Sequence, residues 1–175
     1  QRKAGSYMGR IFGTDGVRGI ANTELSCKLA MNVGRAAAMV IAEQIGRKPV
    51  FLIGKDTRIS SDMLEAALAA GLTSVGADVI LAGVMPTPAL SCLIVQSHAD
   101  AGVMLSASHN PYEYNGIKIF GPEGFKLPDT AEFEIEQIVL DKVKPYSLRW
   151  GWELGRIQPG ENLIETYIDH LRGTV

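Results

Sequence analysis

The stretch with the most reactive side chains is Ser106-Ala-Ser-His-Asn-Pro111, which directly follows the apolar run Ala101-Gly-Val-Met-Leu105. Ser108 offers a hydroxyl nucleophile, His109 a group that can transfer protons, and Asn110 an amide that can order the backbone. Each residue alone is typical of a turn, and the side chains of neighbouring Ser108 and His109 are expected to point apart. The Gly-x-Ser-x-Gly motif of many hydrolases is absent. The stretch therefore favours a serine that carries a chemical group over a hydrolytic serine.

A second cluster, Gly13-Thr-Asp-Gly-Val-Arg-Gly19, combines three glycines with one arginine. The glycines allow the backbone to bend close to a ligand, and the planar guanidinium of Arg18 suits a phosphate group. A glycine-rich turn with a solvated arginine explains the same residues equally well. The cluster is neither a P-loop nor a dinucleotide-binding fingerprint, because neither spacing of glycines occurs.

A third cluster, Gly54-Lys-Asp-Thr-Arg58, ends an apolar run and precedes a helical pattern. Two cations beside a helix N-terminus could hold an anion. Pairing of Asp56 with Arg58 or Lys55 would instead fix the loop, and we favour this structural role for Asp56. Arg58 is then expected to lie behind the site as a cation that adds to phosphate binding.

The elements that must position these clusters alternate along the chain. Helical spacing covers residues 25–45, 60–76, 86–97, 129–144 and 161–171, and short apolar runs predict strands at 49–54, 78–83, 99–105 and 116–121. Ser60 or Ser61 is expected to cap the second helix and Asp129 the fourth. Residues 145–160, with Trp150 and Trp152, are expected to be irregular. The alternation predicts an α/β fold of three layers, with a mixed, largely crossover-connected sheet flanked by helices on both faces.

A fourth cluster, Asn115-Gly-Ile-Lys118, begins the last predicted strand. Lys118 suits either a solvated edge strand or a site, because it alternates with apolar neighbours in both cases. Ligands of open α/β sheets bind at the carboxyl ends of strands, so we expect the four clusters to converge on one edge. In particular, the glycines of the second cluster are expected to turn Arg18 towards Ser108.

The composition excludes several classes of protein. With 175 residues, 46% hydrophobic residues and a net charge of −2, the chain has no basic field that would attract nucleic acid or an anionic membrane. Cys27 and Cys92 lie far apart and predict neither a disulfide framework nor a metal site, which suits a cytoplasmic location. No apolar run is long enough to span a membrane. Residues 1–7 read as a cloning remnant before a natural start at Met8.

The motifs taken together resemble those of the α-D-phosphohexomutases. The resemblance rests on Arg10-Ile-Phe-Gly-Thr-Asp-Gly-Val-Arg-Gly-Ile-Ala-Asn22, Gly83-Val-Met-Pro-Thr-Pro88, Ser106-Ala-Ser-His-Asn-Pro111 and Asn115-Gly-Ile-Lys118. It extends from about Met8 to Leu171. Within the family, the first motif favours the branch that interconverts glucosamine 6-phosphate and glucosamine 1-phosphate for cell-wall precursor synthesis.

The resemblance implies that Ser108 is phosphorylated and passes its phosphoryl group to a phosphosugar through a bisphosphate intermediate. Arg18 and Lys118 would contact the phosphate or the reacting hydroxyl, with Lys118 also transferring a proton and His109 beside them. Asn110 and Arg58 would add to phosphate binding. A phosphate oxygen on Ser108 would be the only ligand from this chain to Mg²⁺, and a hexosamine or hexose 1,6-bisphosphate would activate the enzyme.

The resemblance also implies a domain organisation. The family is a four-domain chain whose metal loop, Asp-Gly-Asp-x-Asp-Arg, and sugar-selecting loop lie in later domains, and neither occurs here. Residues 8–160 are therefore expected to be the first domain and residues 161–175 a helix leading to the second. Two alternatives stay open: a mutase for phosphoglucose or phosphomannose, and a non-catalytic phosphosugar-binding module. The sequence contains no signal for a particular oligomeric state.

Overall fold

The structure is a computed structural model that describes residues 9–174. Within these residues the protein has one sheet of six strands. They are β1 (Val17–Ile20), β2 (Val50–Lys55), β3 (Asp78–Val84), β4 (Ala101–Leu105), β5 (Tyr114–Phe120) and β6 (Ile157–Pro159). Their spatial order is β1-β5-β4-β2-β3-β6. Strands β4, β2, β3 and β6 pair in parallel, whereas β5 is antiparallel to both β4 and β1. The predicted mixed sheet is thereby confirmed.

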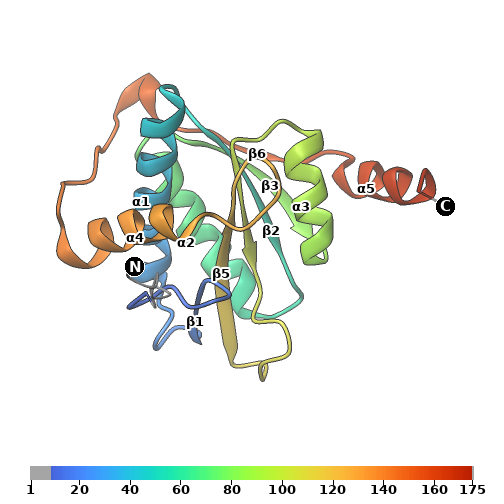
Figure 1. Cartoon of the computed structure of the whole chain (residues 1–175), viewed down its shortest axis with the longest axis horizontal. Coiled ribbons are helices and arrows are strands. Elements are labelled where there is room, and N and C mark those ends of the chain that lie inside the picture. Colours follow the sequence, from blue (N-terminus) through green and yellow to red (C-terminus); the bar gives the residue numbers. More distant parts are fainter. Residues whose placement is uncertain (1–8, 175) are drawn as a thin grey trace, which may run out of the picture.

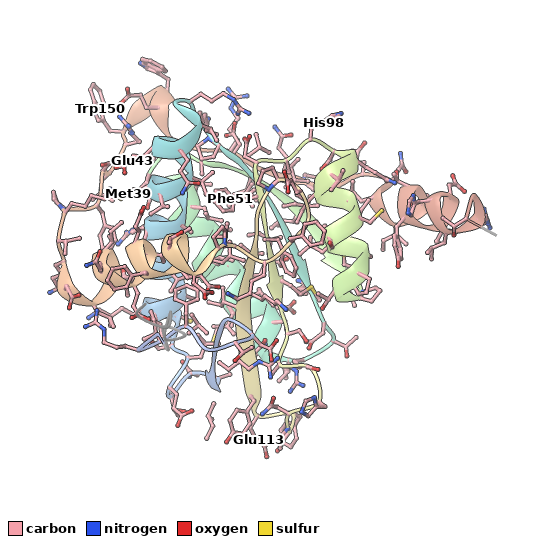
Figure 2. The ribbon with its side chains drawn as sticks, viewed as in Figure 1. Met39, Glu43, Phe51, His98, Glu113 and Trp150 are labelled. Atoms are coloured by element: carbon pink, nitrogen blue, oxygen red, sulfur yellow. The ribbon has the colours of Figure 1, made fainter. Side chains whose placement is uncertain are left out.

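Helices cover both faces of this sheet (Figure 1). The helices α1 (Cys27–Ile45), α2 (Ser60–Ser74) and α4 (Asp129–Glu136) enclose one core with the sheet, and α3 (Thr87–Gln96) and α5 (Leu163–Arg172) lie over the other core. Figure 2 shows Phe51 of β2 inside the molecule, where it is fully buried, and Trp150 projecting at the surface. The three-layer prediction is confirmed, since apolar strands that are buried on both faces need helices on both sides.

Local signals fixed the longest helix. Ser26 precedes α1 and its hydroxyl accepts a hydrogen bond from the Leu29 amide, while Gly46 ends the helix with φ = 70°. A side-chain acceptor at the start and a left-handed glycine at the end satisfy the free backbone groups of a helix. The predicted helix at 25–45 is therefore confirmed to within two residues at its start.

Other boundaries differ from the predictions. Ser60 and Ser61 lie inside α2, and neither caps it; Ile59 precedes the helix without a side-chain bond. Asp129 is the first residue of α4 and not its cap, and a π-helical turn at Gln137–Asp141 ends the helical segment before 144. The segment at 145–160 was predicted to be irregular, but it contains β6, which pairs with β3. A strand of three exposed residues has no alternating apolar pattern to reveal it.

The predicted domain organisation concerns both ends of the chain. Residues 1–7 lie outside the described residues. Helix α5 packs on the second core through Leu163 and Tyr167, while Ile164, Ile168 and Leu171 are exposed. Within residues 9–174, no helix has both the length and the hydropathy needed to cross a membrane.

Candidate active site

The predicted convergence on one sheet edge is found in the structure. Lys55 at the end of β2 pairs with Leu105 at the end of β4, so the parallel strands finish side by side. Because β5 is antiparallel to β4, its first residue returns to the same edge. Residues 106–111, here called the serine loop, leave this edge, and the Ser106 amide donates a 3.1 Å hydrogen bond to the Gly116 carbonyl.

Ser108 lies exposed in the serine loop with φ = 54°, a left-handed conformation that is unusual for a residue other than glycine. Its amide donates to the Ser106 hydroxyl at 3.1 Å. Its Oγ lies 3.3 Å from Nδ1 of His109. The expectation that these two side chains point apart is wrong here, because the left-handed turn brings consecutive side chains to the same side. A residue that its surroundings hold in such a strained conformation is typical of functional sites.

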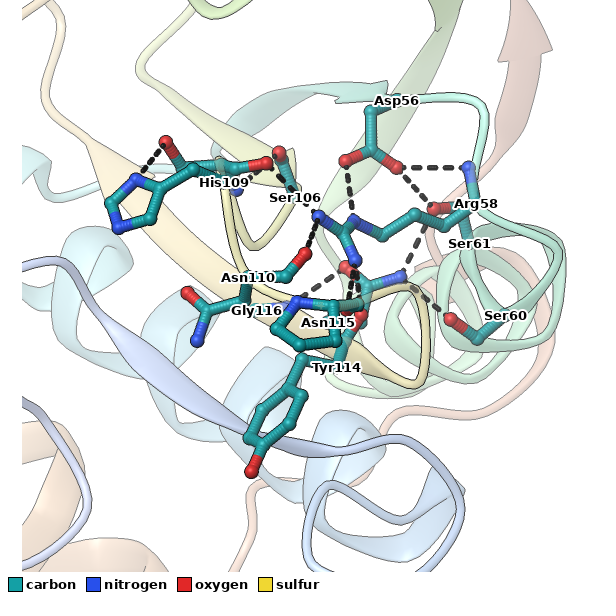
Figure 3. Close-up of polar contacts among 12 residues, drawn as sticks. Asp56, Arg58, Ser60, Ser61, Ser106, His109, Asn110, Tyr114, Asn115 and Gly116 are labelled. Carbon is teal, nitrogen blue, oxygen red and sulfur yellow. Dashed lines mark hydrogen bonds and ion pairs between the residues drawn. The ribbon is translucent and has the colours of Figure 1, made fainter.

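The side chain of Arg58 points into the serine loop, as Figure 3 shows. Its Nε donates to Asp56 at 3.0 Å, Nη1 donates to the Pro111 and Tyr114 carbonyls at 2.6 and 2.9 Å, and Nη2 donates to the Ser108 and Asn110 carbonyls at 3.0 and 2.9 Å. A guanidinium has five N–H donors, and these bonds use all of them. The expected contribution of Arg58 to phosphate binding is therefore not a direct hydrogen bond. Its positive charge still lies next to the loop.

Asp56 anchors this arginine, as its predicted structural role requires. It accepts the Arg58 amide at 3.0 Å and the Ser61 hydroxyl at 3.1 Å. Partial burial opposes ionisation, but hydrogen bonds from Ser106, Arg58 and Ser61 outweigh it and hold the pKa of Asp56 below its ordinary value. The Asp56 carboxylate thus joins the end of β2, the start of α2 and the serine loop.

Asn115 extends the network to β5. Its side-chain amide is fully buried and donates to the hydroxyls of Ser60 at 2.9 Å and Ser61 at 3.1 Å. Its Oδ1 accepts the Gly116 amide at 2.8 Å. The two serines that were expected to cap α2 therefore bind the neighbouring strand instead, and α2 is fixed against the site.

Arg18 reaches the serine loop from β1, which confirms that the second cluster turns towards it. Its Nη1 donates to Oδ1 of Asn110 at 3.1 Å. The turn before β1 fits closely on β5, since Gly16 has φ = 88° and a Cβ there would collide with the Ile117 carbonyl. A residue other than glycine would push the turn away from the site.

Asp15 lies between the two cations that were predicted to bind phosphate. Its Oδ2 is 3.5 Å from Nη2 of Arg18, and its Oδ1 is 3.7 Å from Nζ of Lys118. The Lys118 ammonium also lies 5.6 Å from the centre of the Phe120 ring. Sequence reasoning missed Asp15, and the available signal was its place at the tip of a glycine turn, three residues before Arg18.

The metal-binding capacity of this edge is small. Within residues 9–174, no group of three or more His, Cys, Asp and Glu side chains is arranged to hold a metal ion. Mg²⁺ prefers about six oxygen ligands, and the carboxylate of Asp15 is already paired with Arg18 and Lys118. The described residues alone therefore do not form a magnesium site.

The fold and the serine loop place the chain in a class: residues 9–145 match the family described as phosphoglucomutase/phosphomannomutase, alpha/beta/alpha domain I, and the chain belongs to that family. Among curated proteins it is similar to phosphoglucosamine mutase. The relative from Caldicellulosiruptor bescii is 64% identical over 135 residues, which cover 77% of this chain and 30% of that protein. The relative from Ruminiclostridium cellulolyticum is 51% identical over 168 residues, which cover 96% of this chain and 37% of that protein.

Solved structures agree with this assignment. A candidate phosphomannomutase from Thermus thermophilus has a TM-score of 0.79 and 30% identity, over 94% of this chain and 36% of that one. A phosphoglucomutase/phosphomannomutase family protein from Burkholderia thailandensis has a TM-score of 0.76 and 25% identity, over 93% of this chain and 35% of that one. The chain spans about a third of the length of the relatives it matches.

Proposed function

We propose that the chain is the serine-bearing domain of a phosphoglucosamine mutase, which interconverts glucosamine 6-phosphate and glucosamine 1-phosphate. The observation that carries the proposal is Ser108, an exposed hydroxyl in a left-handed conformation at a strand end, in a loop that Arg58 holds through hydrogen bonds to three of its carbonyl groups. The names of the similar curated proteins support the choice of sugar.

In the proposed reaction, Ser108 carries a phosphoryl group on its Oγ. The bond from phosphorus to this oxygen breaks as a bond to a sugar hydroxyl oxygen forms, which gives a sugar bisphosphate. The other phosphate of the bisphosphate then returns to Ser108. Phosphoryl transfer asks a protein mainly for positioning and charge stabilisation, and a loop fixed at a sheet edge supplies the first.

The neighbouring side chains have the other roles in the reaction. Arg18 neutralises the charge of the phosphate. Asn110 orients the Arg18 guanidinium, because its Oδ1 accepts a 3.1 Å hydrogen bond from Nη1 of Arg18. Lys118 exchanges a proton with the reacting sugar hydroxyl. His109, whose Nδ1 lies 3.3 Å from the Ser108 Oγ, exchanges a proton with that oxygen as it leaves or attacks. Arg58 is a positioning residue that also adds a positive charge below the loop.

The proposed cofactors follow from the charge of phosphoserine, roughly −1.5 to −2 near neutral pH. A phosphate oxygen on Ser108 would give Mg²⁺ one ligand, and other parts of a longer protein would have to supply the rest. Mg²⁺ would add charge stabilisation there. A hexosamine or hexose 1,6-bisphosphate would phosphorylate Ser108 and so activate the enzyme.

The unpaired thiols of Cys27 and Cys92 support a cytoplasmic location.

The proposed domain boundaries are 8–160 for the serine-bearing domain and 161–175 for a connecting helix. A mutase for phosphoglucose or phosphomannose remains the second candidate, because the matched family is described by these two activities. Activity of the intact protein on each of the three sugar phosphates separates the candidates. Turnover of glucosamine phosphates at the highest kcat/KM is expected.

Phosphopeptide mapping tests the proposed carrier. The intact protein that contains this chain is incubated with a labelled hexose 1,6-bisphosphate, and the label is expected on Ser108. In a Ser108→Ala variant the label and the activity should be lost, while stability changes by no more than about 0.5 kcal/mol, because the exposed hydroxyl packs little. Label on Ser106, Thr14 or Thr57, or full activity of Ser108→Ala, would overturn the proposal.

A further inference from the structure

We infer that Asp15 occupies the position between Arg18 and Lys118 that a phosphate group takes during turnover, and that its carboxylate competes with phosphate for both cations. Asp15 would thus be a positioning residue that limits how tightly the site holds phosphate. The inference depends on the proposed function only in naming phosphate as the anion.

The geometry shows a carboxylate in the place of an oxyanion. Its two oxygens face different cations, Oδ2 towards Arg18 at 3.5 Å and Oδ1 towards Lys118 at 3.7 Å. A phosphate group likewise presents several oxygens to several donors at once. Apart from this pair, Arg18 donates one hydrogen bond, to Asn110, so most of its guanidinium donors have no partner among the described residues. They remain available to an incoming anion, in contrast to those of Arg58.

Both contacts are loose and accessible to water. The ion pair between Arg10 and Asp141 in the same protein closes to 2.6 Å, about 1 Å shorter than either contact of Asp15. The Asp15 side chain is 51% exposed. Long, solvated ion pairs are weak, so a more highly charged anion can replace one of them.

The backbone keeps Asp15 at this position. The Gly13 amide donates to the Gly16 carbonyl at 2.9 Å, and the Gly16 amide donates back to the Gly13 carbonyl at 3.3 Å. These bonds close a turn with Thr14 and Asp15 at its tip. Because Gly16 fits against the Ile117 carbonyl, the closed turn rests on β5 beside Lys118. Only the side chain of Asp15 must rotate when phosphate arrives.

The consequence is electrostatic. Without phosphate, Asp15 neutralises part of the charge of two cations that would otherwise repel each other at the sheet edge. With phosphate bound, the displaced carboxylate stays close and repels it. A mutase must let the bisphosphate turn over in the site and must then release a phosphorylated product, so a built-in competitor favours exchange over tight binding.

Titration of the dephosphorylated intact protein with inorganic phosphate tests the inference. Asp15→Asn keeps the shape but removes the charge, and it is expected to lower the Kd for phosphate by about fivefold, the upper end of the effect of a lost surface ion pair. Asp15→Glu keeps the charge and should leave the Kd within about twofold of the wild type.

Glu113→Gln is the matched control. Glu113 lies exposed at the same end of the molecule, just beyond the serine loop, and its side chain forms no ion pair with Arg18 or Lys118 (Figure 2). Removing its charge should change the Kd by less than about twofold. Equal effects of Asp15→Asn and Glu113→Gln, an unchanged Kd in Asp15→Asn, or no measurable phosphate binding in any variant would each overturn the inference.

The outcome is separable from that of the proposed function. Label on Ser108 without tighter phosphate binding in Asp15→Asn would support the proposed phosphoserine and would contradict the proposed competition by Asp15. Tighter binding in Asp15→Asn without label on Ser108 would retain the competing carboxylate and reject the phosphoserine.

Discussion

The Oγ of Ser108 and Nδ1 of His109 lie 3.3 Å apart although the two residues are consecutive in the chain. Consecutive side chains meet here because Ser108 has φ = 54°. An enzyme that uses a histidine beside a serine normally brings it from a distant part of the fold. In this protein one backbone conformation both exposes the hydroxyl and places an imidazole nitrogen beside it.

His109→Asn is expected to slow phosphorylation of Ser108 by about 10²-fold, the usual contribution of a proton-transfer group. Stability should hardly change, because His109 is exposed. The measurement is a single-turnover labelling experiment with a bisphosphate in the intact protein. His98→Asn replaces an exposed histidine in the turn after α3 and should leave the rate unchanged. Equal rates in both variants would remove His109 from the mechanism.

The backbone of Ser108 gives a second expectation. A glycine adopts φ = 54° without strain, whereas an alanine pays about 1 kcal/mol for it. Ser108→Gly should therefore unfold at a higher denaturant concentration than Ser108→Ala, and both should lack activity. Chemical denaturation of the two variants checks this. A less stable glycine variant would show that the loop is not held in the left-handed conformation in solution.

Arg58→Lys tests the support of the serine loop. Lysine keeps the charge but cannot reach four carbonyl groups, so we expect a loss of about 2–4 kcal/mol in stability. At temperatures where the Arg58→Lys variant is still folded, its kcat should fall while its KM changes little. Arg47→Lys is the control, since Arg47 binds both oxygens of Asp100 at 2.9 and 2.6 Å away from the serine loop. It should lose stability but keep kcat, and an equal fall in kcat would argue against a role of Arg58 in positioning.

The depressed pKa of Asp56 predicts an acid dependence of stability. Its folded-state pKa lies below the ordinary value of 3.8, so its stabilisation is fully present above about pH 4 and disappears as the pH falls through the folded-state pKa. Asp56→Asn should be less stable near neutral pH, and its free energy of unfolding should fall less steeply below pH 4. Unfolding curves at several acidic pH values measure the two slopes. Parallel slopes would contradict the hydrogen-bonded carboxylate described above.

Parts of this site were predictable because their signals are local. The apolar run of β4 followed by Ser108 and His109 predicts a strand and a reactive loop, and the binding of ligands at the ends of strands in open α/β sheets leads to the expectation that Arg18 arrives at the same edge. The bonds from Arg58 were not predictable, since its acceptors are mainly backbone carbonyls and these leave no trace in residue types. The place of Asp15 depends on how the glycine turn packs on β5, which is a long-range contact.

The short edge strand β1 contributes little to either core, but it determines when the site can form. Arg18 is paired with Gly116 across β1 and β5, and 116 − 18 = 98 residues separate them. Contacts between residues so distant in the chain carry a high entropic cost and tend to form late in folding. During synthesis Arg18 is made long before β5, the strand that orients it. The ability to bind an anion would therefore report the final step of sheet assembly, after the hydrophobic layers have closed.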